Sequence, residues 1–304
     1  MALTNDLMIG GKRFFISGRI VRILALRNEI IDHLENPVNT IQEIEQRSIS
    51  ADLMTFLQLP PDNSSTFPYH MQMENLAVVR VSTYDNWLKK QIHDNTRKMI
   101  RKASKIGVRV LIQPFSDSLA AGLVEVFNET PIRRGRRYPY YGWDIETVRR
   151  RWATELDRSL WIVAYYHDEL IGFIKLIIGD YLARATGTVT KVAHRDKASM
   201  NALLAKAVEI CASKSVPYLV YGKFIYGRDG EDSLTAFKKR NGFEKLDVPR
   251  YFIPLSFRGR IALRLGLHRG LKELMVPAAG VKLFRKLRSA WYEGLIEHLP
   301  PGRR

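Results

Sequence analysis

The sequence of 304 residues contains one cysteine, and this scarcity excludes two kinds of site. A single thiol cannot form an intramolecular disulfide, and it cannot supply a zinc site held by several cysteines. Cys211 lies in the stretch ALLAKAVEICA, on the apolar face of a predicted helix. We therefore expect a buried structural thiol rather than a nucleophile.

Recognisable metal-binding and nucleotide-binding motifs are also missing. The seven histidines are scattered, and no two of them have the spacing of metal ligands. The chain has no P-loop, no dinucleotide fingerprint and no Gly-x-Ser-x-Gly turn. We therefore expect no metal site and no bound cofactor.

Long apolar segments are absent as well. The longest apolar run, LIGFIKLIIG, is interrupted by Lys175 and is too short to span a bilayer. The N-terminus lacks the apolar core of a signal peptide. We therefore expect a cytoplasmic protein, and peripheral attachment to the inner face of the membrane stays open.

Positive charge is what the sequence has in excess. Lys and Arg number 48 against 31 Asp and Glu, which gives a formal net charge of +17. Such a charge favours a polyanionic partner, namely a nucleic acid, an anionic membrane or a phosphorylated ligand. Charge alone does not choose among these partners.

One predicted helix concentrates this charge. In NTRKMIRKASKIGV, Asn95 or Thr96 can cap the helix and Gly107 can end it. One face is apolar, and the other carries cations with no acidic residue among them. These cations are Arg97, Lys98, Arg101, Lys102 and Lys105. Because like charges at this spacing repel one another, we predict a polyanion-binding face; a solvated face is the alternative.

The stretch RRGRRYPYYGWD is predicted to be a loop that mixes arginines with aromatic residues. Arg133, Arg136 and Tyr141 are candidates for contacting a donor, because guanidinium groups bind phosphate and rings stack on bases. The same composition also suits cation–π packing with no ligand. Glu129, in the preceding NETP, is either a general base or an anchor for this loop.

The pattern from residue 160 onwards predicts an α/β (α+β) fold with a mixed central sheet flanked by helices. LWIVAYY and LIGFIKLIIG form a hairpin, and the whole order is β-β-β-α-β-α-β. We divide the chain into an N-terminal α/β region at 1–88, a central domain at 89–256 and a basic tail at 257–304.

The tail contains 11 Lys or Arg against 3 Glu. Its apolar residues Phe284, Leu287, Trp291 and Leu295 recur at helical spacing. We predict an amphipathic helix that either docks on the protein's own core or lies on an anionic membrane.

Several of these stretches resemble known acyltransferases. YYHDELIGFIKL and SLTAFKKRNGF resemble the central hairpin and the late helix of the GNAT superfamily. NTRKMIRKASKIGV resembles a run in the Fem family of aminoacyl-tRNA-dependent ligases and related GNAT-like bacterial proteins, as does the pair Phe237-Lys238. The resemblance covers roughly residues 85–257. It implies a GNAT-like fold, and residues 1–88 are long enough for only part of a second GNAT-like unit.

Two departures from acetyl-CoA-dependent GNAT enzymes affect the choice of donor. Residues 195–200 lack the glycines that let backbone N–H groups approach a pyrophosphate. The helix N-terminus and the side chains of His194, Arg195 and Lys197 remain as candidate donor contacts, with Asp196 or Ser199 as the helix cap. Lys238 stands where many of those enzymes have a tyrosine that protonates the leaving thiolate.

The resemblance implies an N-acyltransferase that forms an amide from an activated donor and an amine, with a cell-envelope or glycan precursor among the possible acceptors. Lys238 would stabilise an oxyanion or a phosphate, and Tyr226 would donate a proton. The donor stays open between acyl-CoA and aminoacyl-tRNA, the latter making tRNA a partner. The alternative is a non-catalytic protein on a GNAT scaffold that binds nucleic acid or an anionic membrane.

Overall fold

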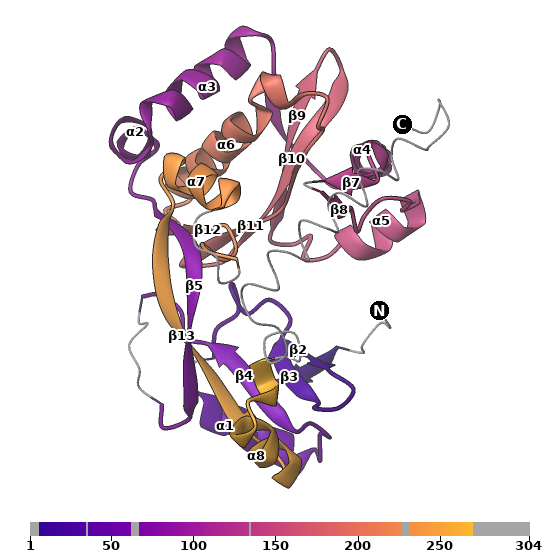
Figure 1. Cartoon of the computed structure of the whole chain (residues 1–304), viewed down its shortest axis with the longest axis vertical. Coiled ribbons are helices and arrows are strands. Elements are labelled where there is room, and N and C mark those ends of the chain that lie inside the picture. Colours follow the sequence, from indigo (N-terminus) through magenta and orange to yellow (C-terminus); the bar gives the residue numbers. More distant parts are fainter. Residues whose placement is uncertain (1–5, 35, 62–66, 134, 227–231, 270–304) are drawn as a thin grey trace. The chain divides into compact units, whose positions relative to one another are not determined.

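The structure, a computed structural model, describes residues 6–34, 36–61, 67–133, 135–226 and 232–269 (Figure 1). The chain forms two compact units. Unit 1 comprises residues 1–78, 223–225 and 245–276, and unit 2 comprises the remainder. The predicted helix at 284–295 lies outside the described residues, and the three-part division of the chain stays a prediction.

Unit 1 is a sheet with the strand order β1-β2-β3-β4-β13-β5. The strands are β1 (Leu7–Ile9), β2 (Lys12–Ser17), β3 (Ile23–Leu26), β4 (Leu53–Leu57), β13 (Glu244–Pro254) and β5 (His70–Arg80). β3 and β4 run parallel, whereas β13 and β4 are antiparallel. Helix α1 (Pro37–Gln46) is capped by the side chain of Asn36, and α8 (Phe257–Arg264) follows β13. A short 3₁₀ turn, Leu267–Arg269, comes after α8.

The sheet of unit 2 has the order β12-β11-β10-β9-β6. Its strands are β6 (Arg109–Gln113), β9 (Ser159–Tyr166), β10 (Glu169–Ile178), β11 (Leu182–Thr190) and β12 (Tyr218–Val220). β9 and β10 form the predicted hairpin through a two-residue turn, His167-Asp168, with both φ angles positive. β11 and β12 are parallel, so the sheet is mixed.

Unit 2 also contains most of the described helices. They are α2 (Tyr84–Asn86), a π-helical turn (Trp87–Gln91), α3 (Asp94–Lys105), α4 (Asp117–Asn128), α5 (Ile145–Trp152), a 3₁₀ turn (Arg195–Lys197), α6 (Ser199–Ser213) and α7 (Ser233–Arg240). A small separate ribbon pairs β7 (Ile132–Arg133) with β8 (Arg136–Arg137).

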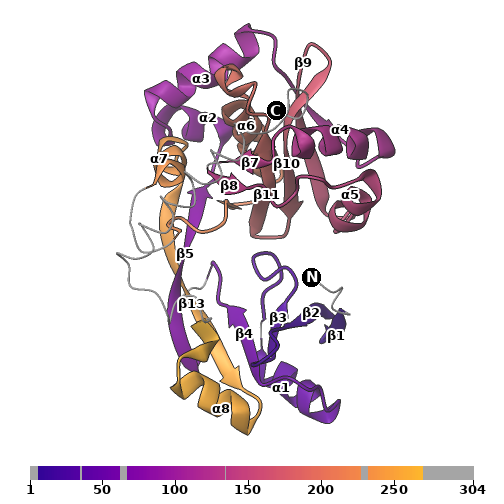
Figure 2. The same cartoon turned by 45° about the vertical axis from the view of Figure 1, so that its right-hand side comes forward.

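Helices cover both faces of this sheet, as Figure 2 shows, with α6 on one face and α4 and α5 on the other. Trp161, Val163 and Phe173 pack into the cluster formed with α4 and α5. Because strand side chains alternate, Ile162 and Ile174 point to the opposite face. The packing is close at Gly187 (φ +60°), where a Cβ atom would lie 2.3 Å from the Trp152 ring.

The element order from β9 to β13 confirms the predicted β-β-β-α-β-α-β pattern. Cys211 is buried as predicted, and burial raises the pKa of its thiol to about 12. The predicted helix caps were wrong: His93 caps α3 through Nδ1, and α6 begins at Ala198 with no side-chain cap. Among the described residues, no helix is both long and apolar enough to cross a membrane.

Candidate functional site

Lys238 occupies the centre of an aromatic cluster in unit 2. Its side chain is completely buried, and its Nζ lies 4.8 Å from the ring centres of both Tyr221 and Tyr226. The two rings stabilise the cation through their negative faces. Tyr226 is 49% exposed, so this cluster, which we call the lysine cluster, reaches the surface there. The structure thus brings together two of the predicted catalytic residues.

The end of the β11–β12 pairing positions this cluster. The parallel pairing covers only Leu182–Arg184 with Tyr218–Val220, and β11 then continues to Thr190. Beyond the pairing, the Thr188 hydroxyl donates a hydrogen bond of 2.9 Å to the Tyr221 hydroxyl. In open α/β sheets, ligands bind beyond the carboxyl ends of the parallel strands, and Tyr221 directly follows the carboxyl end of β12. The lysine cluster has such a position.

The end of α7 is held rigidly next to Lys238. The Asn241 side chain donates to the Phe237 carbonyl and accepts a hydrogen bond from Asn201 of α6. Its carbonyl accepts from the Trp87 indole at 3.1 Å. Gly242 (φ +79°) turns the chain towards β13, as predicted for the Asn-Gly pair. The neighbouring Lys239 and Arg240 are exposed, unlike Lys238.

Glu129 follows directly after α4 and binds the segment that leaves β11. Its two carboxylate oxygens accept hydrogen bonds from the backbone N–H groups of Val192 (2.7 Å) and Ala193 (2.8 Å). One oxygen also lies 3.0 Å from the Arg133 guanidinium. Because both carboxylate oxygens of Glu129 are already bonded, the geometry favours a role as an anchor of this segment over a role as a general base.

The backbone of residues 191–198 has little hydrogen-bonding capacity left for a ligand. Seven of its eight N–H groups donate within the protein, two to Glu129 and five to backbone carbonyls. A pyrophosphate would need free N–H groups here. Side chains therefore remain as the main candidates for anion contact in this segment.

The predicted donor contacts in the arginine-rich loop, residues 133–144, differ in their exposure to solvent. Arg133 is mostly buried, donates to the carbonyls of Thr190 and Val126, and stacks at 4.4 Å from the ring centre of Tyr138. Tyr138 itself belongs to the core, and burial raises the pKa of its hydroxyl. Arg136 and Tyr141 are exposed. For Arg133 and Tyr138 the structure thus shows the cation–π alternative, while Arg136 and Tyr141 are free to meet a ligand.

His194 takes part in a charged group that includes two residues we did not predict. Glu169 accepts from Lys191 at 2.6 Å and lies 3.0 Å from His194 Nε2. The hydrogen bond from Lys191 is the main cause that lowers the pKa of Glu169, and His194 contributes. Glu169 begins β10 and Lys191 follows β11. The antiparallel register of β10 and β11 places Glu169 near Lys191, so knowledge of this register would have been needed to predict their contact.

Arg195 and Lys197 lie in the 3₁₀ turn before α6. Lys197 lies 2.9 Å from Asp196 and 4.9 Å from the ring centre of Tyr166. Arg195 is exposed. The pKa of Asp196 is lowered, first by its hydrogen bond with Lys197 and further by the positive charge of Lys102 in α3. The basic helix α3 also packs against α6, the helix that follows this turn.

Helix α3 presents most of its predicted cations to solvent. Arg97 is the exception, because it donates to the carbonyls of Leu88 and Ile92 and pairs with Asp94. The other four, Lys98, Arg101, Lys102 and Lys105, are exposed and form no salt bridge within the described part of the chain. The start of α3 is tied to the end of α7, since the Arg240 carbonyl accepts from His93 N–H and from the Thr96 hydroxyl.

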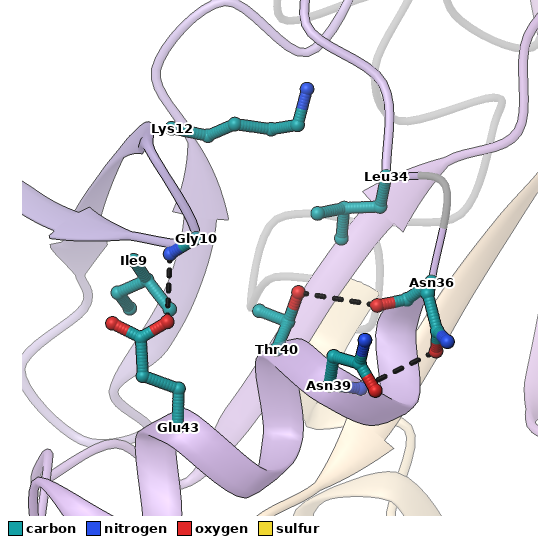
Figure 3. Close-up of a pocket in the computed structure, with 8 residues that line it drawn as sticks. All are labelled: Ile9, Gly10, Lys12, Leu34, Asn36, Asn39, Thr40 and Glu43. Atoms are coloured by element: carbon teal, nitrogen blue, oxygen red, sulfur yellow. Dashed lines mark hydrogen bonds between the residues drawn. The ribbon is translucent and has the colours of Figure 1, made fainter.

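A pocket of about 350 Å³ lies elsewhere, in unit 1 (Figure 3). Its polar lining includes Lys12, Asn36 and Glu43, and the Glu43 carboxylate accepts from the N–H of Gly10. None of the predicted site residues lines it. Across the residues that the structure describes, no group of three or more His, Cys, Asp or Glu side chains could hold a metal ion.

Solved structures identify the fold. FemX aligns over 86% of this chain and 90% of its own, with a TM-score of 0.58 and 10% identity. L-PGS from Bacillus licheniformis aligns over 87% and 88%, with a TM-score of 0.57 and 12% identity. The C-terminal domain of a putative lysylphosphatidylglycerol synthetase from Agrobacterium fabrum aligns over 87% and 88%, with a TM-score of 0.55 and 12% identity.

No family model matches the sequence, and no curated protein does. The chain has a GNAT-like fold of the Fem type, as the sequence resemblance predicted. At 10–12% identity this likeness establishes the fold alone.

Proposed function

We propose that this protein is a Fem-like aminoacyltransferase, which transfers an aminoacyl group from an aminoacyl-tRNA to an amine acceptor. The fold is one that FemX and L-PGS share with this chain. The amine of a cell-envelope or glycan precursor is the acceptor that the resemblance to Fem ligases suggests. The protein therefore forms an amide and releases the tRNA.

One observation carries the choice of donor. Seven of the eight backbone N–H groups at residues 191–198 are bonded within the protein, whereas the neighbouring α3 exposes Lys98, Arg101, Lys102 and Lys105. The first property disfavours a backbone cradle for the pyrophosphate of CoA. The second suits an extended polyanion, because several separated phosphates are each met by a cation.

The chemistry requires few groups from the protein. The neutral amine attacks the ester carbonyl, the C–N bond forms, and the C–O bond to the tRNA ribose breaks. The amine loses a proton and the ribose oxygen gains one. Holding both reactants in place supplies several kcal/mol, roughly 7–11 in well-aligned cases. Lys238 would stabilise the negative charge that develops, and the hydroxyl of Tyr226 would pass the proton.

Glu129 and the charged group around Glu169 act in this proposal as positioning elements. Glu129 holds residues 192–193, and Glu169 orients His194. Arg136, Tyr141, Arg195 and Lys197 would contact the acceptor arm of the tRNA. Arg133 would support these contacts from its fixed position.

The test compares donors on the full chain. We would measure thermal stabilisation and acyl transfer to a panel of amine acceptors, with charged tRNA, uncharged tRNA and acetyl-CoA as ligands. We expect charged tRNA to raise the melting temperature and to support transfer, and acetyl-CoA to do neither. Stabilisation and transfer with acetyl-CoA alone would overturn the choice of donor.

Acyl-CoA is the second candidate donor, and one observation favours it. The 15-residue helix α6 begins without a side-chain cap, so the N–H groups of Ser199 and Met200 and the helix dipole are its candidate contacts for a phosphate. A protein that binds RNA or anionic vesicles but transfers nothing from either donor would instead match the non-catalytic alternative.

A further inference from the structure

Helix α8 of unit 1 exposes a stripe of large apolar side chains. Phe257 is 68% exposed, Ile261 40% and Leu265, directly after the helix, 60%. Residues four apart lie above one another on a helix, so these three side chains form one continuous line. Single exposed apolar residues are common on soluble proteins, whereas a contiguous line with a polar border marks an interaction surface.

The opposite side of α8 is fixed to the sheet. Ala262 is buried, and Gly259 packs so closely that a Cβ atom would lie 1.9 Å from the carbonyl oxygen of Asp52. Ser256 caps the helix by accepting from Gly259 N–H at 3.1 Å, and its hydroxyl donates to Asp52 at 2.9 Å. The small residues Gly259 and Ala262 let α8 pack closely on this side, and the apolar line faces away from it.

Arginines border the apolar line on both sides. At 100° per residue, Arg258 lies on one side of the line, and Arg260 and Arg264 lie on the other. Arg258 donates to the carbonyl of Ile20, a second exposed apolar residue (64%) in the loop that contacts this border. Residues 257–269 contain no acidic side chain.

From this arrangement we propose that α8 with Ile20 is a docking surface for an anionic lipid bilayer. An apolar line between cationic borders fits the boundary between headgroups and acyl chains, where the ring and aliphatic side chains are buried and the guanidinium groups meet lipid phosphates. The proposal does not depend on the transfer reaction.

Charge distinguishes the bilayer from two other occupants. A second copy of this surface would place arginine against arginine. Residues 270–304 of the chain contain 7 Lys or Arg against 3 Glu, so this segment would also bring positive charge to a positive border. An anionic bilayer is the partner that complements both the apolar line and its rim.

The test uses the full chain with vesicles of 70% phosphatidylcholine and 30% phosphatidylglycerol, and with pure phosphatidylcholine vesicles. A Phe257→Ser, Ile261→Ser, Leu265→Ser variant should lose at least tenfold in binding to the anionic vesicles. A matched control, Leu111→Ser, Ile112→Ser, Leu156→Ser, alters three apolar residues of unit 2 that are also exposed and should bind as the unchanged protein does. Equal binding by the α8 variant, or equal binding to both kinds of vesicle, would overturn the proposal.

A second measurement does not require the triple variant to be stable. A fluorophore attached to Ile261→Cys should shift its emission to the blue on adding the anionic vesicles, since the only native thiol, Cys211, is buried. The same label on Leu111→Cys should not shift. A blue-shifted label before any lipid is added would mean that a second copy or residues 270–304 cover α8, and would contradict the proposal.

Discussion

The Nζ of Lys238 lies 4.8 Å from the centre of the Tyr226 ring, yet the lysine is fully buried while the tyrosine is 49% exposed. The cation therefore has a defined position before any substrate arrives. Preorganised charge is more effective than charge that must move into place during the reaction. This relationship motivates the first prediction.

Replacing Lys238 with methionine should reduce transfer by about 100-fold or more, the usual effect of losing one preorganised group that stabilises an oxyanion. Methionine has a similar length and suits the aromatic surroundings. Single-turnover transfer from the charged tRNA would be measured together with circular dichroism. Lys239→Met changes the exposed neighbour and is the control. A Lys238→Met protein that folds and retains full activity would remove this residue from the mechanism.

Charge reversal on α3 should weaken binding of tRNA. The pair Lys102→Glu and Lys105→Glu should lower affinity at least tenfold and make the dependence on salt less steep, because fewer counterions are released. Titrations at several salt concentrations would measure both effects. Lys12→Glu with Lys214→Glu makes the same change in net charge outside α3. An equal loss in this control would show that the overall charge, rather than α3, is responsible.

Glu129→Gln should destabilise unit 2 by about 2–3 kcal/mol, since the amide has one acceptor oxygen where two backbone donors and Arg133 were satisfied. Thermal denaturation would report the loss. Glu125→Gln, on the exposed side of α4, should have little effect. If Glu129→Gln keeps its stability but loses transfer together with the acid limb of the pH–rate profile, the residue is a general base rather than an anchor.

Arg250 should be important for the stability of unit 1. It makes a bidentate contact with Glu29 at 2.6 and 2.9 Å and bonds Glu74 at 2.6 Å. Arg250→Met would remove the positive charge that neutralises the carboxylates of Glu29 and Glu74. We expect the free energy of unfolding to fall by about 3–5 kcal/mol. Lys245→Met, which breaks an exposed pair on the same strand, should cost at most about 1 kcal/mol. Chemical denaturation would compare the two, and equal losses would contradict the prediction.

Because of Lys175, the free energy of unfolding should increase as the pH rises in the alkaline range. Burial lowers the pKa of this lysine to about 8 from 10.5. Between these values the unfolded chain binds more protons than the folded one, so the folded state gains stability as the pH rises. The gain is at most about 3 kcal/mol. The free energy of unfolding would be measured at several pH values in this range for the unchanged protein and for Lys175→Met, and the difference gives the contribution of Lys175. If both proteins show the same dependence on pH, the prediction is wrong.

Local patterns in the sequence were sufficient for much of the fold. Two apolar runs joined by a polar turn predicted the hairpin of β9 and β10, helical spacing predicted α3 and α6, and Asn241-Gly242 predicted the turn after α7. These features depend on interactions between near neighbours in the chain, which is why a single sequence reveals them. The helix caps were less predictable, because His93 and Ala198 are not typical N-cap residues.

The tertiary structure decided which of the charged residues are available. Lys238 and Lys239 are adjacent and chemically identical, yet packing against Tyr221 and Tyr226 buries the first and leaves the second exposed. Likewise, Arg133 pairs with Glu129, which also binds the segment after β11, whereas Arg136 remains on the surface. The sequence by itself determined that the chain is basic and has a GNAT-like arrangement. Which cations face a ligand depends on contacts between residues far apart in the chain, and only folding creates those contacts.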